Sequence, residues 1–174
     1  MGGEMKKLLV LLVILVMILC GCGQSQDTPS KPSGSDQQKE ELAPLNADDF
    51  VFKTESGSIE LNKEFDPAKF GEYQYEEAAS CGYAGYDKFY TYTAFEVCTY
   101  PNGKDYVSYV DLFEGAETSR GLKVGDSVSL MEEKYGKDYT VAAGIYTYKL
   151  DDCELMFTSE NGVINAIEYA YSGQ

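Results

Sequence analysis

A pattern of alternating tyrosines, followed by a strand-like run and an Asn-Gly pair, occurs twice in this chain and constrains its fold. It begins at Tyr90 as YTYTAFEVCTYPNG and at Tyr146 as YTYKLDDCELMFTSENG. Such alternation is typical of half-buried β-strands. Asn-Gly favours a type I′ hairpin turn, because both central residues need positive φ. We therefore expect one antiparallel hairpin in each half, turning at Asn102-Gly103 and at Asn161-Gly162.

Each half also carries helical signals ahead of its hairpin. In the second half, residues 125–136 read GDSVSLMEEKYG, where Asp126 or Ser127 can cap the free N–H groups. Met131 and Tyr135 then share the buried face of the helix. The first half has a shorter counterpart, DPAKFG, whose proline is tolerated in a first helical turn.

These signals predict an α+β domain over residues 46–174. We expect a tandem repeat of a short helix followed by antiparallel β-hairpin strands, with the helices packed on the sheet. The two repeats would cover about 50–115 and 116–174. The alternative is that two β-hairpins merely share turn chemistry. Near 130 residues are enough for one ordinary domain.

The N-terminus has the features of an export signal. Two lysines precede an unbroken apolar run, Leu8–Leu19, which is too short for a permanent membrane-spanning helix. The following LCGC places Gly21 before Cys22 and resembles the lipobox of bacterial lipoproteins. The resemblance implies a signal peptide over 1–21, acylation of Cys22, and a place in the cell membrane facing outside the cytoplasm. An uncleaved anchor or an ordinary signal peptide is the alternative.

The next segment, 22–45, has the composition of a disordered tether. It is rich in Ser, Gln, Pro and Lys, and Leu42 is its one aliphatic residue before Ala43. The whole chain has a formal net charge of −15. An acidic domain is repelled by nucleic acid, so we expect no nucleic-acid partner. The lipid bilayer, reached through acylated Cys22, and an unknown protein or envelope component are the expected partners.

Chemistry beyond binding has little support in the sequence. The chain has no histidine, which removes the usual general base and the usual metal ligand. Its acidic pairs lack the spacing of a calcium loop, and it has no glycine-rich phosphate loop. We expect no catalytic residue, no cofactor and no metal. A disulfide could join Cys81 to Cys98 or to Cys153, and the odd count leaves at least one thiol unpaired.

Two sets of residues are candidates for ligand contact. Alternation places Tyr90 and Tyr92 on the apolar face of their hairpin. The opposite, open face would then carry Thr91, Glu96 and Tyr100.

The second candidate is the loop GYAGYDK, because loops on rigid scaffolds often carry function. Its candidate contact residues are Tyr83, Tyr86, Asp87 and Lys88. An Asp87–Lys88 pair that only orders this loop is equally consistent with the sequence.

The run SCGYAGYDKFYTYTAFEVCTYPNGKDYV (80–107), with TSRGLKVGDSVSLMEEKYG (118–136), resembles a family of uncharacterised lipoproteins from Gram-positive Firmicutes. The shared wording is S-C-x3-G-x-D-K, then Y-T-Y and T-Y-P. The chain is more loosely similar to β-lactamase-inhibitor-protein-like and SmpA/OmlA-type repeat lipoproteins. These resemblances imply a helix-plus-antiparallel-sheet repeat, export and protein binding.

Together these observations predict a membrane-anchored extracytoplasmic lipoprotein that acts as a non-catalytic binding module. Its ligand would be a protein, a peptide or an envelope component. Two alternatives remain open: an inhibitor of a secreted hydrolase, and a histidine-free enzyme.

Overall fold

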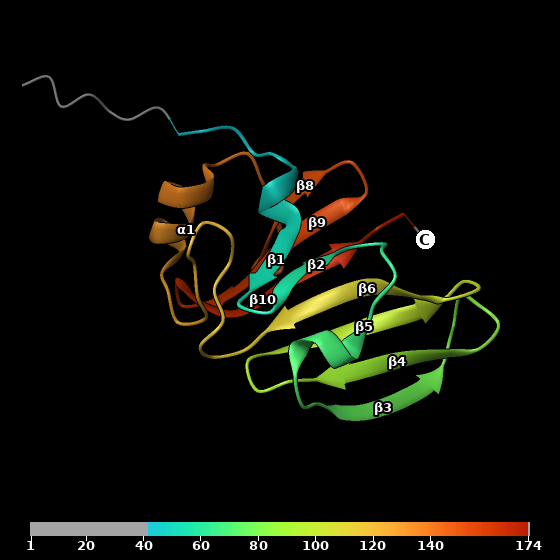
Figure 1. Ribbon diagram of the computed structural model, residues 1–174. Coiled ribbons are helices and arrows are strands. Elements are labelled where there is room, and N and C mark those ends of the chain that lie inside the picture. Colours follow the sequence, from blue (N-terminus) through green and yellow to red (C-terminus); the bar gives the residue numbers. More distant parts are fainter. Residues whose placement is uncertain (1–41, 174) are drawn as a thin grey trace, which may run out of the picture. The chain divides into compact units, whose positions relative to one another are not determined.

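The computed structural model describes residues 42–173 and is mostly β structure (Figure 1). Three predicted features lie outside the described residues. They are the signal peptide (1–21), the predicted lipidation site Cys22 and most of the predicted tether (22–45). No helix within 42–173 is long and apolar enough to cross a membrane.

An eight-stranded antiparallel sheet forms most of the domain, in the order β3-β4-β5-β6-β10-β9-β8-β7. Its strands are β3 (Gln74–Ala79), β4 (Tyr86–Thr91), β5 (Phe95–Pro101), β6 (Asp105–Leu112), β7 (Thr140–Ala142), β8 (Ile145–Leu150), β9 (Cys153–Glu160) and β10 (Val163–Tyr171). Each half of the chain contributes four consecutive strands. The halves join where β6 pairs with β10, at the centre of the sheet.

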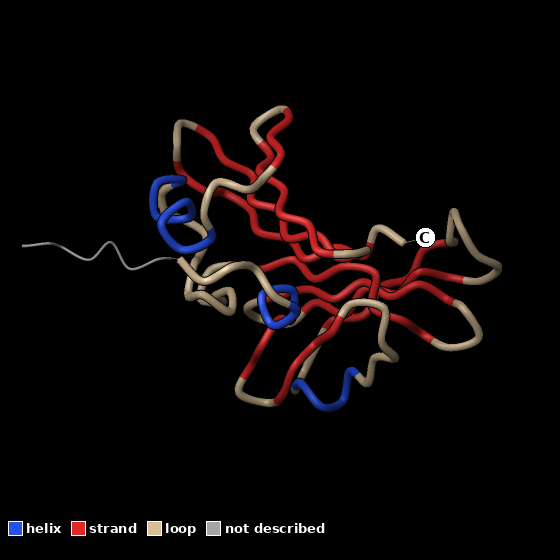
Figure 2. The backbone as a smooth tube through the Cα atoms, turned by 90° about the horizontal axis from the view of Figure 1, so that it is seen from above, coloured by secondary structure: helices blue, strands red, loops and turns tan. Residues whose placement is uncertain are grey.

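The remaining elements cover one face of this sheet. They are the 3-10 turns η1 (Ala47–Phe50) and η2 (Pro67–Phe70), the strands β1 (Val51–Thr54) and β2 (Gly57–Glu60), and the helix α1 (Val128–Tyr135). Strands β1 and β2 form a separate two-stranded sheet. Figure 1 shows this hairpin lying across the large sheet, and Figure 2 shows η1 and η2 on the same side.

The prediction of an α+β tandem repeat with helices on a sheet is therefore wrong. Within the described residues α1 is the only α-helix, and DPAKFG forms just the 3-10 turn η2. The first half covers the sheet with the β1–β2 hairpin instead. Its buried Phe52 and Ile59 face each other across the two strands. The apolar residues of VFKTESGSIEL (51–61) are spaced as in strands, so this segment favours a hairpin over a helix.

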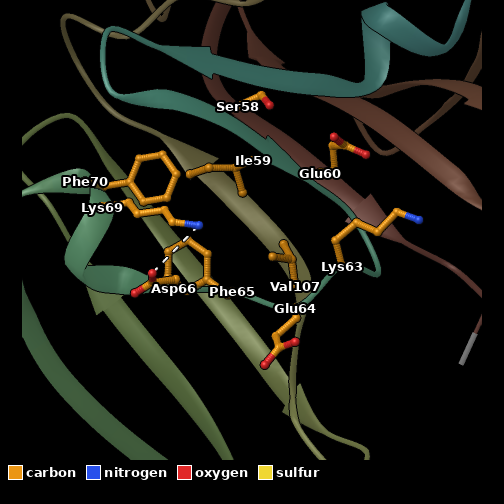
Figure 3. A pocket seen from close by; sticks show the side chains of 10 residues that line it. All are labelled: Ser58, Ile59, Glu60, Lys63, Glu64, Phe65, Asp66, Lys69, Phe70 and Val107. Atoms are coloured by element: carbon orange, nitrogen blue, oxygen red, sulfur yellow. Dashed lines mark ion pairs between the residues drawn. The ribbon is translucent and has the colours of Figure 1, made fainter.

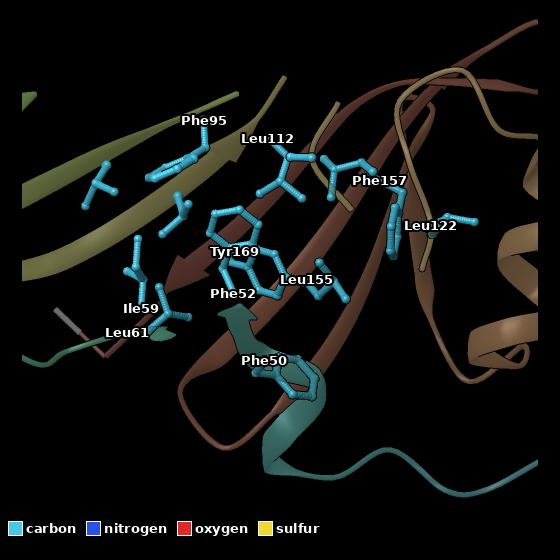
Figure 4. Packing of buried hydrophobic residues seen from close by; sticks show 14 of the residues in the cluster. Phe50, Phe52, Ile59, Leu61, Phe95, Leu112, Leu122, Leu155, Phe157 and Tyr169 are labelled. Carbon is cyan, nitrogen blue, oxygen red and sulfur yellow. The ribbon is translucent and has the colours of Figure 1, made fainter. Parts of the chain in front are cut away.

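The core lies between this cover and the sheet (Figure 4). Phe52 of β1 packs edge-on against Phe95 at a centroid distance of 5.0 Å, and its ring lies 6.2 Å from Tyr169. Burial of each large apolar side chain stabilises the fold by about 1.5–3 kcal/mol. The sheet residues fully buried in this core include Val97, Val107, Val110, Tyr148, Leu155, Phe157, Ile167 and Tyr169.

Helix α1 matches its predicted details. The Ser127 hydroxyl accepts a hydrogen bond from the Leu130 N–H at 3.1 Å, and Gly136 ends the helix with φ of 81°. Met131 and Tyr135 are buried, as their spacing predicts. The Tyr135 ring lies 5.4 Å from Phe157, so the helix packs on the core side of β9.

The two Asn-Gly turns differ from each other. Asn161 and Gly162 both have positive φ, 55° and 79°, which confirms the type I′ turn between β9 and β10. In the other turn Gly103 has positive φ but Asn102 does not. Pro101 there pairs with Asp105, so the loop has three residues and the type I′ prediction is wrong at this position.

A buried ion pair connects the covering segments. Arg120 donates from Nε to Asp49 Oδ1 at 2.7 Å and from Nη2 to Asp49 Oδ2 at 2.6 Å. Its guanidinium also bonds the carbonyl oxygens of Ala43, Pro44 and Lys134 at 2.8–3.1 Å. Arg120 thereby holds η1, the connection before α1, and α1 itself together.

Replacing Arg120 with alanine should lower the free energy of unfolding by about 3–5 kcal/mol, because Asp49 is only 4 % exposed and would keep an uncompensated charge. Urea titration measures this loss. The control Lys123→Ala, at an exposed ion pair with Glu117, should change it by less than about 0.5 kcal/mol. Equal effects from the two substitutions would contradict the proposed role.

Acid titration gives a second measure of the same pair. Burial raises the pKa of Asp49, but the hydrogen bonds and charge of Arg120 outweigh it, and the net pKa is lowered. The stabilisation is therefore present above about pH 4 and is lost as the pH falls through the lowered pKa.

Candidate functional site

The face of the large sheet that points away from the core is the candidate functional site, and we call it the outer face. Its side chains alternate with those that enter the core. In the central strands they belong to Phe89, Thr91, Glu96, Cys98, Tyr109, Asp111, Thr147, Glu154, Met156 and Glu168.

Three carboxylates stand in one row across the middle of this face. Glu96 of β5 is the register partner of Asp111 of β6, and Asp111 is the register partner of Glu168 of β10. Directly opposed residues in a sheet have Cβ atoms about 4.5–5.5 Å apart. Like charges at this spacing repel, so the row destabilises the isolated domain.

No positively charged side chain within residues 42–173 forms an ion pair with this row. Thr91 donates a hydrogen bond to Glu96 at 2.5 Å, but no ion pair within residues 42–173 involves Glu96, Asp111 or Glu168. The neighbouring Glu154 is bound to Lys149 at 2.9 Å.

Burial and mutual repulsion shift the proton affinities of the row. Burial raises the pKa of Glu168 to about 7, and the charges of Asp111 and Glu154 add to the rise. Burial also raises the pKa of Asp111, with a further contribution from Glu96. Shifted carboxylates of this kind occur preferentially at functional sites.

The next row of the outer face is less polar. Cys98 is only 4 % exposed and lies between Phe89 and Tyr109 in the register. Burial raises the pKa of the Cys98 thiol to about 12, so it stays protonated at neutral pH. The outer face thus combines a carboxylate row with adjoining aromatic, thiol and thioether groups, the last from Met156.

The predicted open-face residues have different positions. Thr91 and Glu96 are on the outer face and half-buried. Tyr100 does not stand open: it is 4 % exposed, stacks on Tyr83 at 4.9 Å, and donates to Asn62 Oδ1 at 2.6 Å. Asn62 precedes it by 38 residues, and this long-range contact had no local signal.

The predicted loop residues do not form one site. Tyr83 stacks on Tyr100, whereas Tyr86 begins β4 and is 54 % exposed. Lys88 forms an ion pair with Asp105 of β6 at 2.7 Å, and not with Asp87 as the sequence suggested. The Oδ1 atom of Asp87 is buried without a hydrogen-bond partner.

All three cysteines within residues 42–173 are free thiols, so the structure contains neither predicted disulfide. Cys81 is exposed in the β3–β4 loop, and Cys98 is buried on the outer face. Cys153 packs against the core, on the other side of the sheet from Cys98.

Asp111 and Glu168 were not among the predicted site residues. The alternation in YVSYVDLF could have placed Asp111 on the polar face of its strand, and that in VINAIEYAY could have done the same for Glu168. The pairing of β6 with β10, which sets them side by side, joins strands more than 50 residues apart and had no sequence signal.

A shallow cleft of about 160 Å³ lies on the covered side, between β2, η2 and β6 (Figure 3). Three of its five charged side chains form ion pairs: Lys69 lies 3.7 Å from Asp66, and Glu64 lies 2.6 Å from Lys104, which is outside the cleft lining. This pairing makes the cleft a weaker candidate than the outer face. Residues 42–173 contain no group of His, Cys, Asp or Glu suited to hold a metal ion.

No protein-family model, no curated protein and no solved structure matches this chain. The resemblance to lipoprotein families therefore stays a prediction.

Substituting Glu168 with glutamine should stabilise the domain by about 1–3 kcal/mol at pH 8 and have little effect near pH 4. The raised pKa means that the folded state holds a proton between about pH 4.5 and 7, so stability falls as the pH rises through this window. Urea titrations at the two pH values measure the difference. The exposed control Glu160→Gln should show none, and equal effects at both pH values would refute the assignment.

Proposed function

We propose that this chain is a membrane-anchored, extracytoplasmic binding module whose outer face binds a positively charged surface of a partner protein. The observation that carries the proposal is the row Glu96, Asp111 and Glu168, three carboxylates without described counter-charges at the centre of the sheet. Lysine and arginine side chains of a partner would supply those charges.

Binding explains this row better than folding does. The isolated domain is destabilised by the repulsion and by the partial burial of the carboxylates. The positive charges of a cationic partner would offset both effects, because they lower the pKa of Glu168 and restore its full charge. The surrounding Tyr109 and Met156 supply the kind of side chain that is enriched in protein interfaces.

Export and anchoring rest on the sequence. The basic start, the short apolar run and the cysteine after Gly21 support acylation of Cys22, and several acyl chains anchor a protein stably. An acidic domain is repelled by anionic lipid, so a lipid anchor would hold it at the membrane while its outer face stays free for a protein.

One observation favours a second candidate, a histidine-free enzyme. Neighbouring carboxylates with raised pKa values, such as Asp111 and Glu168, can act as an acid and a base. Their position on a sheet face gives less protection from water than a closed active site does, so the binding function has the stronger support. Loss of a hydrolytic activity of the purified protein in Glu168→Gln would favour the enzyme.

Anchoring is tested by Cys22→Ala in cells. We expect the native chain in the membrane fraction and the variant in the soluble or secreted fraction. The neighbouring Cys20→Ala is the matched control and should remain membrane-bound. A Cys22→Ala protein that stays in the membrane fraction would rule out the acylated anchor.

Partner binding is tested with a photo-crosslinking residue at Thr147, beside Met156 on the outer face, and one at Lys63 in the cleft on the covered side. We expect capture of a basic protein at Thr147 alone. The neutral variant Glu96→Gln/Asp111→Asn/Glu168→Gln should weaken its binding at least tenfold, or about 1.4 kcal/mol. Higher salt should weaken the native complex as well.

The neutral variant should be at least as stable as the native domain, so lost binding cannot be attributed to unfolding. Capture at Thr147 that is equally strong in the neutral variant, or that is insensitive to salt, would contradict the proposed charge recognition.

A further inference from the structure

Strand β3 is an unpaired edge of the large sheet and a surface separate from the carboxylate row. Its six residues pair with β4 alone, whereas the opposite edge, β7, has three residues. Six strand residues extend over roughly 20 Å. All six are exposed.

The hydrogen-bond pattern shows which backbone groups of this edge are free. Ser80 donates its N–H to Gly85 O at 3.0 Å, so Ser80 and every second residue before it bond to β4. The backbone groups of Tyr75, Glu77 and Ala79 therefore point outward, and no hydrogen bond to a described residue is present for them.

This edge lacks most of the features that protect edge strands. Such strands are usually short, bulged, or interrupted by proline or lysine. The β3–β4 register runs from Gln74 to Ala79 without a shift, and QYEEAA contains neither proline nor lysine. The strand is thus a geometrically regular template for another strand.

Exposed tyrosines adjoin the same edge. Tyr73 and Tyr75 are 41 % and 47 % exposed, and their rings lie 5.4 and 5.5 Å from the ring of Tyr90. Tyr75, which has an outward backbone, is on the same sheet face as Tyr90, its register partner. A strand added beside β3 would place alternate side chains against Tyr73 and Tyr75.

The charges of the edge define the partner. Glu76 and Glu77 project to opposite faces of β3, so an added strand would meet a carboxylate on each face. The register partner of Glu77 is Lys88, but this lysine is bound to Asp105 at 2.7 Å. A second copy is disfavoured, because the two antiparallel registers of greatest overlap that use the outward groups would oppose Glu77 with Glu77 or Glu76 with Glu76.

We infer that β3 binds an extended, basic polypeptide segment by strand addition. The outward backbone groups of Tyr75, Glu77 and Ala79 bond the added strand, Tyr73 and Tyr75 pack against its side chains, and Glu76 and Glu77 select lysine or arginine.

A displayed library of random peptides of about ten residues, selected on the purified domain, tests this inference. We expect enriched peptides with lysine or arginine, which slow amide exchange at Tyr75, Glu77 and Ala79. Ala79→Pro should weaken them at least tenfold, since proline removes an outward N–H and leaves the β3–β4 ladder intact. The matched control Val141→Pro, on the opposite edge, should bind them normally.

A second variant keeps the test decisive if proline disturbs folding. Glu76→Lys/Glu77→Lys should reverse the selection toward acidic peptides. The neutral outer-face variant should bind the basic peptides normally, which separates this surface from the proposed function. The inference would be overturned if no peptides were enriched, or if the native edge enriched neutral or acidic peptides. It would also be overturned if a folded Ala79→Pro variant bound the basic peptides as well as the native domain does.

Discussion

The pair between Asp49 and Arg120 is the interaction on which the covered side of the sheet depends. Its two parallel hydrogen bonds, at 2.7 and 2.6 Å, are made where Asp49 is almost fully buried. A buried charge is tolerated only with such a partner. Because the guanidinium also bonds backbone carbonyls before η1 and in α1, one side chain determines how three separate segments meet over the core.

Coverage of one face alone gives the two sides of the sheet different chemistry. On the covered side, alternate residues such as Val110 and Tyr169 are buried among aromatic rings. The residues between them, Asp111 and Glu168, necessarily point to the other side. The same β6–β10 register that aligns the apolar residues therefore brings the two carboxylates together. Their repulsion is a direct consequence of the arrangement that builds the core.

Local signals in the sequence predicted what depends on local contacts. The cap and buried face of α1, the turn at Asn161-Gly162, and the burial of Tyr90 and Tyr92 all follow from residues within a few positions of one another. The prediction of an α+β repeat was wrong because it assumed that the two halves also share the elements that cover the sheet. Those elements are a hairpin in one half and a helix in the other.

The candidate site was harder to predict because it depends on strand order. Glu96 was placed on the correct face by alternation, but its neighbours Asp111 and Glu168 come from strands whose pairing no local pattern specifies. For Tyr100, alternation gave the wrong environment. Its alternation suggested an open position, yet Tyr83 and Asn62 close over it. Arg120 binds the carbonyl oxygens of Ala43 and Pro44 on the covered side, so the chain enters the domain there. A partner on the outer face would therefore not compete for space with Ala43 and Pro44.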